Sequence, residues 1–141
     1  MLEQEIATYK GPEAIPALGK KRQVLIVDDN KAVRDVLARM LSFLGCHVTL
    51  AGNGLEGGTL FLTGSYDLVV TDLQMPLMNG LELSRLVKER SPRTPVILVT
   101  GSYDEKHCEQ MSMKCVDAVI PKPFRVQEIE KTIQRLLDSG S

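Results

Sequence analysis

Five short apolar runs, rich in β-branched residues, alternate with helix-length segments along this chain. The runs cover residues 23–27, 47–50, 66–70, 95–99 and 117–120. Runs of this length, separated by helix-length segments, are typical of buried strands in a parallel sheet. The pattern therefore predicts an α/β fold in which helices cover both faces of a five-stranded parallel sheet, a three-layer sandwich.

Five helices are predicted between and after these strands. The first, over residues 33–44, has an apolar stripe at three- and four-residue intervals and meets a C-terminal capping glycine at Gly45. The second, over residues 53–62, is weakly encoded, because Gly57 and Gly58 each cost about 1 kcal/mol relative to alanine. The remaining three are expected over residues 81–90, 104–113 (with a poor apolar stripe) and from 126 onwards.

The chain of 141 residues is long enough for one domain with a proper core. Glycine and proline interrupt any periodic pattern in residues 1–22, which end in the basic triplet Lys20-Lys21-Arg22. We expect residues 1–22 to be a linker or flexible N-terminal arm with a solvated triplet, and residues 23–139 to be the folded domain.

Composition argues against several classes of function. The formal net charge is −1 and tryptophan is absent, so we expect neither a nucleic-acid partner nor attraction to an anionic membrane. No apolar stretch approaches the ~20 residues of a spanning helix and the acidic start is no signal peptide, so the cytoplasm is the expected location. The three cysteines lack CxxC spacing, which predicts free, buried or half-buried thiols.

Residues suited to magnesium or phosphate follow four of the predicted strands: Asp28 with Asp29, Asp72, Thr100 and Lys122. The carboxyl ends of parallel strands lie at one edge, where such sheets bind ligands, so these side chains should meet. Two carboxylates in the first turn would repel a phosphate unless a cation mediated. Magnesium fits best, because it binds carboxylates while keeping several waters. Without metal, the carboxylates should raise one another's pKa.

With magnesium bound, one of the carboxylates can attack a phosphoryl group and form an aspartyl phosphate. Charge then builds on the phosphoryl oxygens, and catalysis is mainly positioning and charge compensation. Lys122 can supply a positive charge and Thr100 a hydrogen bond. The residues therefore predict magnesium-assisted phosphoryl chemistry.

From about residue 23 to 137, the chain resembles the receiver domains of two-component response regulators. The resemblance rests on Asp28-Asp29, on the block from Asp72 to Gly80 (DLQMPLMNG), on Thr100-Gly101 and on Lys122-Pro123-Phe124. It implies a flavodoxin-like, doubly wound sheet with strand order 2-1-3-4-5. It also implies a cis Lys122–Pro123 peptide bond.

The resemblance further implies a role for each site residue. Magnesium would be bound by Asp29 directly, by Asp28 mainly through water, by Asp72 and by the backbone carbonyl of Gln74. Asp72 would be the phosphoacceptor, Lys122 would pair with the phosphoryl group, and Thr100 would be the switch hydroxyl. The family often has an aromatic switch residue three positions before the lysine, where this chain has Val119; Tyr103 is an alternative.

The predicted function is a phosphorylation-dependent signalling switch. It would accept a phosphoryl group from a histidine kinase or histidine phosphotransfer domain, lose it to water, and act on an unidentified effector. It would be no enzyme beyond its own phosphorylation and dephosphorylation. Two alternatives stay open: a degenerate receiver that only binds a partner, and an aspartyl-phosphate phosphohydrolase. The latter usually has a second acid two residues after the nucleophile, where this chain has Gln74.

Overall fold

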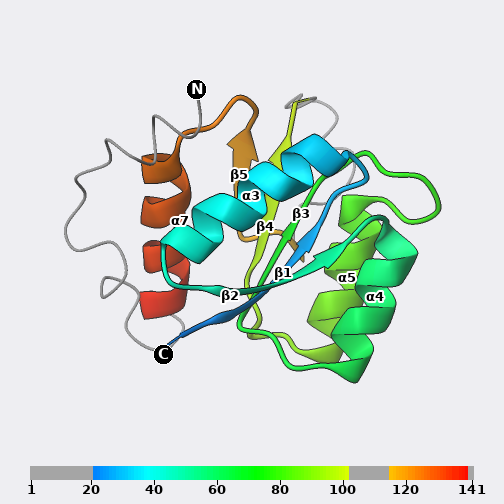
Figure 1. Cartoon of the computed structure of the whole chain (residues 1–141). Helices are drawn as coiled ribbons and strands as arrows, with labels where there is room; N and C mark the ends of the chain where they lie inside the picture. The colour runs from blue at the N-terminus through cyan, green and yellow to red at the C-terminus, as the bar shows by residue number, and fades with distance from the viewer. Residues whose placement is uncertain (1–20, 102–114, 140–141) are drawn as a thin grey trace.

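The computed structural model describes residues 21–101 and 115–139, which form a five-stranded parallel sheet between two pairs of helices (Figure 1). The strands are β1 (Gln23–Val27), β2 (His47–Ala51), β3 (Leu68–Thr71), β4 (Val96–Thr100) and β5 (Ala118–Pro121), and the helices are α3 (Lys31–Phe43), α4 (Gly54–Thr63), α5 (Gly80–Arg90) and α7 (Val126–Ser139). The strand order β2-β1-β3-β4-β5 confirms the predicted fold. Within these two ranges, no helix is long and apolar enough to cross a membrane. The helix expected over residues 104–113, Tyr103, and residues 1–20 of the expected arm lie outside the described residues.

Both faces of the sheet are buried. Helices α3 and α7 cover one face, and α4 and α5 cover the other (Figure 1). Alternate residues of β1 divide between the two layers: Val24 and Ile26 pack in the α3/α7 core, while Leu25 and Val27 pack in the α4/α5 core. Because the side chains on both faces of a central strand are buried in apolar layers, the central strands are continuous apolar runs in the sequence.

Helix α3 has a local signal at each end. The side chain of Asn30 accepts a hydrogen bond from the N–H of Val33 at 3.2 Å, which caps the first turn. At the other end, Gly45 has a left-handed φ of 93°. The N–H of Cys46 then donates to the carbonyl of Leu41 at 2.9 Å, the long hydrogen bond of a Schellman motif. The predicted glycine cap is confirmed.

Two of the glycines in helix α4 lie where a side chain would not fit, and they allow the helix to pack closely against its neighbours. A Cβ atom on Gly57 would lie 2.7 Å from a methyl group of Val27, and one on Gly54 would overlap the carbonyl oxygen of Met78. At Gly58 the nearest atom, from Leu86, would be 3.6 Å away. Close packing against β1 and the loop before α5 therefore offsets the low helix propensity.

The apolar runs had predicted that Asp67 and Asp117 lie within strands. In the structure both residues precede their strands, β3 and β5. The N–H of Asp67 donates to the carbonyl of Gln23 at 2.7 Å, and its carboxylate accepts the N–H of Gln23 at 2.8 Å. Asp117 repeats this reciprocal pair with Val96, at 2.9 Å and 2.7 Å. Lys88 adds an ion pair to Asp117 at 2.7 Å. Each aspartate thus closes the N-terminal end of a neighbouring strand.

The two cysteines in the described ranges, Cys46 and Cys115, are free thiols. Cys46 is buried and Cys115 is half-buried, as predicted, whereas Cys108 lies outside these ranges. Burial raises the pKa of Cys46 to about 11. Its thiol is therefore protonated at neutral pH and behaves as a small apolar side chain.

Candidate metal and phosphoryl site

Carboxylates that follow two adjacent strands meet at the C-terminal edge of the sheet. Strands β1 and β3 are parallel neighbours that end at the same level, with Val27 opposite Thr71. Asp28 and Asp29 follow the first strand, and Asp72 follows the second. Each acid offers a carboxylate oxygen, and the three oxygens lie within 4.8 Å of one another. The predicted convergence of the acids is present.

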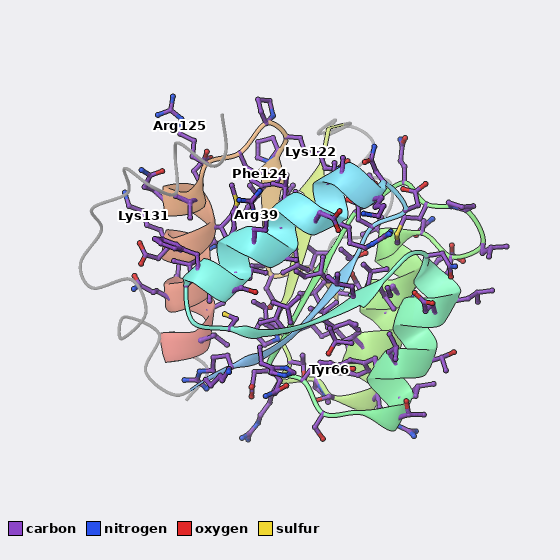
Figure 2. The ribbon with its side chains drawn as sticks, in the orientation of Figure 1. Arg39, Tyr66, Lys122, Phe124, Arg125 and Lys131 are labelled. Atoms are coloured by element: carbon purple, nitrogen blue, oxygen red, sulfur yellow. The ribbon has the colours of Figure 1, made fainter. Side chains whose placement is uncertain are left out.

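Lys122 brings a positive charge to the acids from the end of β5. Its backbone N–H donates to the carbonyl of Thr100 at 2.9 Å. Its ammonium lies 3.3 Å from Oδ2 of Asp28 and 3.6 Å from Oδ1 of Asp72. The Lys122–Pro123 peptide bond is cis, as the resemblance implied. Figure 2 shows Lys122 at one end of the sheet and Tyr66 at the opposite end.

The adjacent acids Asp28 and Asp29 differ in environment. Asp28 is fully buried. Its Oδ1 accepts the N–H of Asn30 at 2.8 Å, and its Oδ2 faces Lys122. Asp29 is exposed. One acid is therefore committed to fixed partners inside the protein, while the other presents its carboxylate to solvent and can bind a cation directly.

Burial raises the pKa of Asp72. The positive charge of Lys122 and a hydrogen bond from the N–H of Leu73 lower it, whereas the negative charges of Asp28 and Asp29 raise it. That hydrogen bond, to Oδ1, is 2.9 Å long. The predicted mutual rise in pKa among the acids is therefore present at Asp72, but burial contributes more than its acidic neighbours do.

The segment between Asp72 and α5 is held by a capping box. The side chain of Asn79 accepts the N–H of Glu82 at 2.8 Å, and the carboxylate of Glu82 accepts the N–H of Asn79 at 3.0 Å. The N–H of Gly80 donates to the carbonyl of Leu73 at 2.8 Å. A Cβ atom on Gly80 would overlap the carbonyl oxygen of Asp72. This glycine allows the helix to start directly against the backbone of Asp72.

Thr100 and Gln74, the remaining predicted site residues, lie in different settings. Thr100 is buried at the end of β4, opposite Pro121 in β5. Gln74 is exposed, two residues after Asp72. Val119, at the family's aromatic position, packs instead against a small buried cluster of Leu73, Leu81 and Leu98. The side chain at this position therefore makes an aliphatic contact.

Arg34 is a residue near the site that the sequence did not single out. Its guanidinium donates to the backbone carbonyl of Asp28 at 2.8 Å, which places a second positive charge beside the acids. A Cβ atom on Gly52 would lie 3.4 Å from the same guanidinium. The only signal in the sequence is a basic residue six positions after Asp28, and exposed helix surfaces have many of these.

The donor set fits a divalent cation. Three carboxylates, the ammonium of Lys122 and the guanidinium of Arg34 give a formal charge of −3 + 2 = −1. Magnesium is bound in proteins through one or two carboxylates together with water. The exposed carboxylate of Asp29 and the half-buried one of Asp72 are suited to that role, and a cation would offset the excess of negative charge at the site.

The chain belongs to the response regulator receiver domain family, because residues 24–134 match the family model. It is 31% identical to the autoinducer 1 sensor kinase/phosphatase LuxN of Vibrio campbellii over 84% of its own length and 14% of LuxN. It is 32% identical to the transcriptional regulatory protein CusR of Escherichia coli K12, over 84% of its own length and 52% of CusR. The chain thus spans about half or less of these relatives.

Solved structures support the same assignment. The response regulator TrrA of Thermotoga maritima, in complex with Mg²⁺ and BeF, matches with a TM-score of 0.76 and 29% identity over 82% of this chain and 99% of that one. Family and fold together make this protein a receiver domain of two-component systems, a class of phosphoacceptor signalling domains.

Proposed function

We propose that the domain is a signalling switch in which Asp72 accepts a phosphoryl group from the phosphohistidine of a histidine kinase or phosphotransfer domain. The main support is the convergence of the three acids within 4.8 Å, with the ammonium of Lys122 at 3.6 Å from Asp72. Asp72 is the best nucleophile of the three. Asp28 has both oxygens engaged, and the exposed Asp29 makes no ion pair with Lys122 within the described ranges.

In this proposal Asp29 binds Mg²⁺ directly, Asp28 binds it mainly through water, and Asp72 and the backbone carbonyl of Gln74 complete the protein ligands. The excess of negative charge at the site supports it, as does the complex of TrrA with Mg²⁺ and BeF. The bound ion would neutralise the acids and the phosphoryl oxygens, which otherwise repel each other.

During transfer, a carboxylate oxygen of Asp72 forms a bond to phosphorus while the bond from phosphorus to the imidazole nitrogen of the donor breaks. Lys122, which contacts Asp28 and Asp72 before the reaction, moves to pair with a phosphoryl oxygen. The hydroxyl of Thr100 donates to another oxygen and thereby reports the modification. Water then attacks phosphorus, releases inorganic phosphate and restores the carboxylate of Asp72.

The same proposal covers the organisation around the site. Residues 23–139 would be the receiver unit, joined to residues 1–22 as a linker or arm, and the family match over residues 24–134 supports these bounds. The phosphorylated form would act on a downstream effector in the cytoplasm. The kinase and regulator relatives support a phosphohistidine donor.

Intact mass after incubation with Mg²⁺ and acetyl phosphate tests this proposal. We expect one added phosphoryl group on the wild type, none on Asp72→Asn, and none when EDTA replaces Mg²⁺. Asp35→Asn is the matched control, because Asp35 is an exposed acid on α3 paired with Lys31, and it should be modified like the wild type.

Two results would contradict the proposal. A folded wild type that gains no phosphoryl group would indicate the binding module, and a modification that persists in Asp72→Asn would assign the chemistry to another residue. Steady release of phosphate from an added phosphomonoester would indicate the phosphohydrolase.

A further inference from the structure

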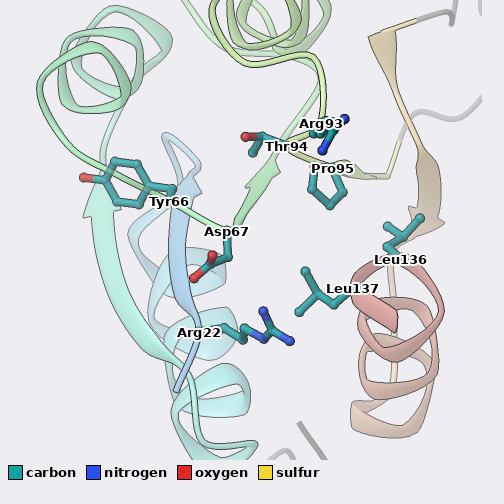
Figure 3. A pocket seen from close by; sticks show the side chains of 8 residues that line it. All are labelled: Arg22, Tyr66, Asp67, Arg93, Thr94, Pro95, Leu136 and Leu137. Carbon is teal, nitrogen blue, oxygen red and sulfur yellow. The ribbon is translucent and has the colours of Figure 1, made fainter. Parts of the chain in front are cut away.

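A cavity of about 230 Å³ lies at the end of the sheet opposite to the acids (Figure 3). Tyr66, which helps to line it, is at the far end of the sheet from Lys122 (Figure 2). Its lining combines the charged side chains of Arg22, Asp67 and Arg93 with the apolar ones of Pro95, Leu136 and Leu137. The cavity therefore shares no residue with the phosphoryl site.

Arg22 carries a buried donor without a partner. The sequence predicted a solvated side chain here, but Arg22 is half-buried and its Nε is shielded from water with no hydrogen-bond partner. Figure 3 shows this side chain extending from the start of β1 toward Leu137. A charged N–H group that has lost water and gained no acceptor is unfavourable. The side chain of Arg22 lines the cavity, so a partner for its guanidinium would be an acceptor that binds there.

Asp67 does not fill that role. Its Oδ2 accepts the N–H of Gln23 at 2.8 Å, and no ion pair joins it to Arg22 in the part of the chain that the structure describes. Arg93, whose side chain is exposed, adds a second guanidinium. Two guanidinium groups and one carboxylate leave a formal charge of 2 − 1 = +1 in the lining. That balance favours an anion.

We propose that this cavity binds a small monocarboxylate with an apolar body. The carboxylate would accept hydrogen bonds from Arg22, with Arg93 beside it, because the planar guanidinium matches a carboxylate. The body would pack against Pro95, Leu136 and Leu137. A monocarboxylate fits better than a phosphate, whose charge of about −1.5 to −2 exceeds that of the lining and would be repelled by Asp67. This binding is independent of the phosphoryl chemistry.

Titration of the ¹⁵N-labelled full chain with benzoate, followed by NMR, tests the proposal. We expect saturable shifts at Arg22, Asp67 and Leu137, with a Kd of about 1–10 mM for so small a ligand. Arg22→Gln should weaken binding about tenfold, the loss of a charge-assisted hydrogen bond. Arg93→Gln should weaken benzoate binding less, and it should not affect folding because the side chain of Arg93 is exposed. Arg85→Gln, an exposed arginine on α5, is the matched control and should bind like the wild type.

The proposal is overturned if the shifts do not saturate, or if Arg22→Gln and Arg93→Gln both bind benzoate as tightly as Arg85→Gln does. Benzyl alcohol and inorganic phosphate test the two halves of the ligand. If benzyl alcohol binds as tightly as benzoate, the carboxylate does not contribute to binding. If phosphate binds as tightly as benzoate, the apolar body does not contribute. Weaker binding of both supports the site.

Discussion

The two ends of the sheet carry the same residue type and use it in opposite ways. Asp67 and Asp117 lie at the N-terminal end, and Asp28 and Asp72 lie at the C-terminal end. In the sequence each of the four borders an apolar strand. In the structure the first two close strand ends through hydrogen bonds of 2.7–2.8 Å to the backbone, whereas the other two gather with Asp29 into one acidic cluster.

Strand direction explains the difference. A parallel strand begins with a backbone N–H that has no ladder partner and ends with a free carbonyl. A carboxylate at the N-terminal end therefore finds a donor on the neighbouring strand. At the C-terminal end it faces carbonyl oxygens and other acids, so its donors come from elsewhere: the N–H groups of Asn30 and Leu73 and the ammonium of Lys122. The remaining negative charge suits this end to the cation site proposed above.

The largest expected effect follows from removing a charge at the C-terminal end. Asp29→Asn should slow phosphorylation by acetyl phosphate by roughly 10²–10³-fold, the cost of losing one charge-stabilising group in an active site. The thermal midpoint should not fall, because Asp29 is exposed and its removal relieves repulsion. Initial rates from intact mass over a range of Mg²⁺ concentrations measure the change. A normal rate at low Mg²⁺ would show that Asp29 does not bind the ion.

At the N-terminal end we expect the reverse, a loss of stability with chemistry intact. Asp117→Ala leaves the N–H of Val96 without its acceptor and removes the ion pair of Lys88, whose ammonium keeps the carbonyl of Thr94 at 2.7 Å. It should lower the free energy of unfolding by about 2 kcal/mol, measured by urea denaturation. The folded fraction should still gain a phosphoryl group at the wild-type rate. Asp35→Ala is the control for loss of a surface ion pair. If the free energy of unfolding falls by the same small amount in Asp117→Ala and Asp35→Ala, then Asp117 contributes no more to stability than the surface ion pair of Asp35 does.

This contrast also marks how far the sequence alone could go. The convergence of the acids was predictable, because parallel strands end at one edge wherever their exact limits fall. The roles of Asp67 and Asp117 were missed, since an apolar run does not show which residue turns its side chain back onto a backbone N–H. The fit of Gly57 against Val27 and the burial of Arg22 depend on contacts between elements. Periodicity does not encode such contacts.

The smallest expected effect is a dependence of stability on pH that originates at the C-terminal end. Burial raises the pKa of Asp72 above its ordinary value of 3.8, so the folded chain holds this proton at pH values where the unfolded chain has lost it. The free energy of unfolding therefore falls as pH rises from 3.8 through the raised pKa of Asp72 in the folded chain. Metal-free Asp72→Asn should unfold a few degrees above the wild type at pH 7, and the gain should vanish in acid, below 3.8.

Asp35→Asn is a control for which we expect the opposite change in the thermal midpoint. A hydrogen bond from Lys31 lowers the pKa of Asp35, so its ionised form favours the folded state and the substitution should lower the midpoint at neutral pH. Thermal unfolding in EDTA from acid to neutral pH measures both variants. Mg²⁺ should then raise the midpoint of the wild type more than that of Asp72→Asn, because the ion stabilises the carboxylate that burial disfavours. A gain for Asp72→Asn that is the same at every pH would show that its origin is packing and not the charge at the C-terminal end of the sheet.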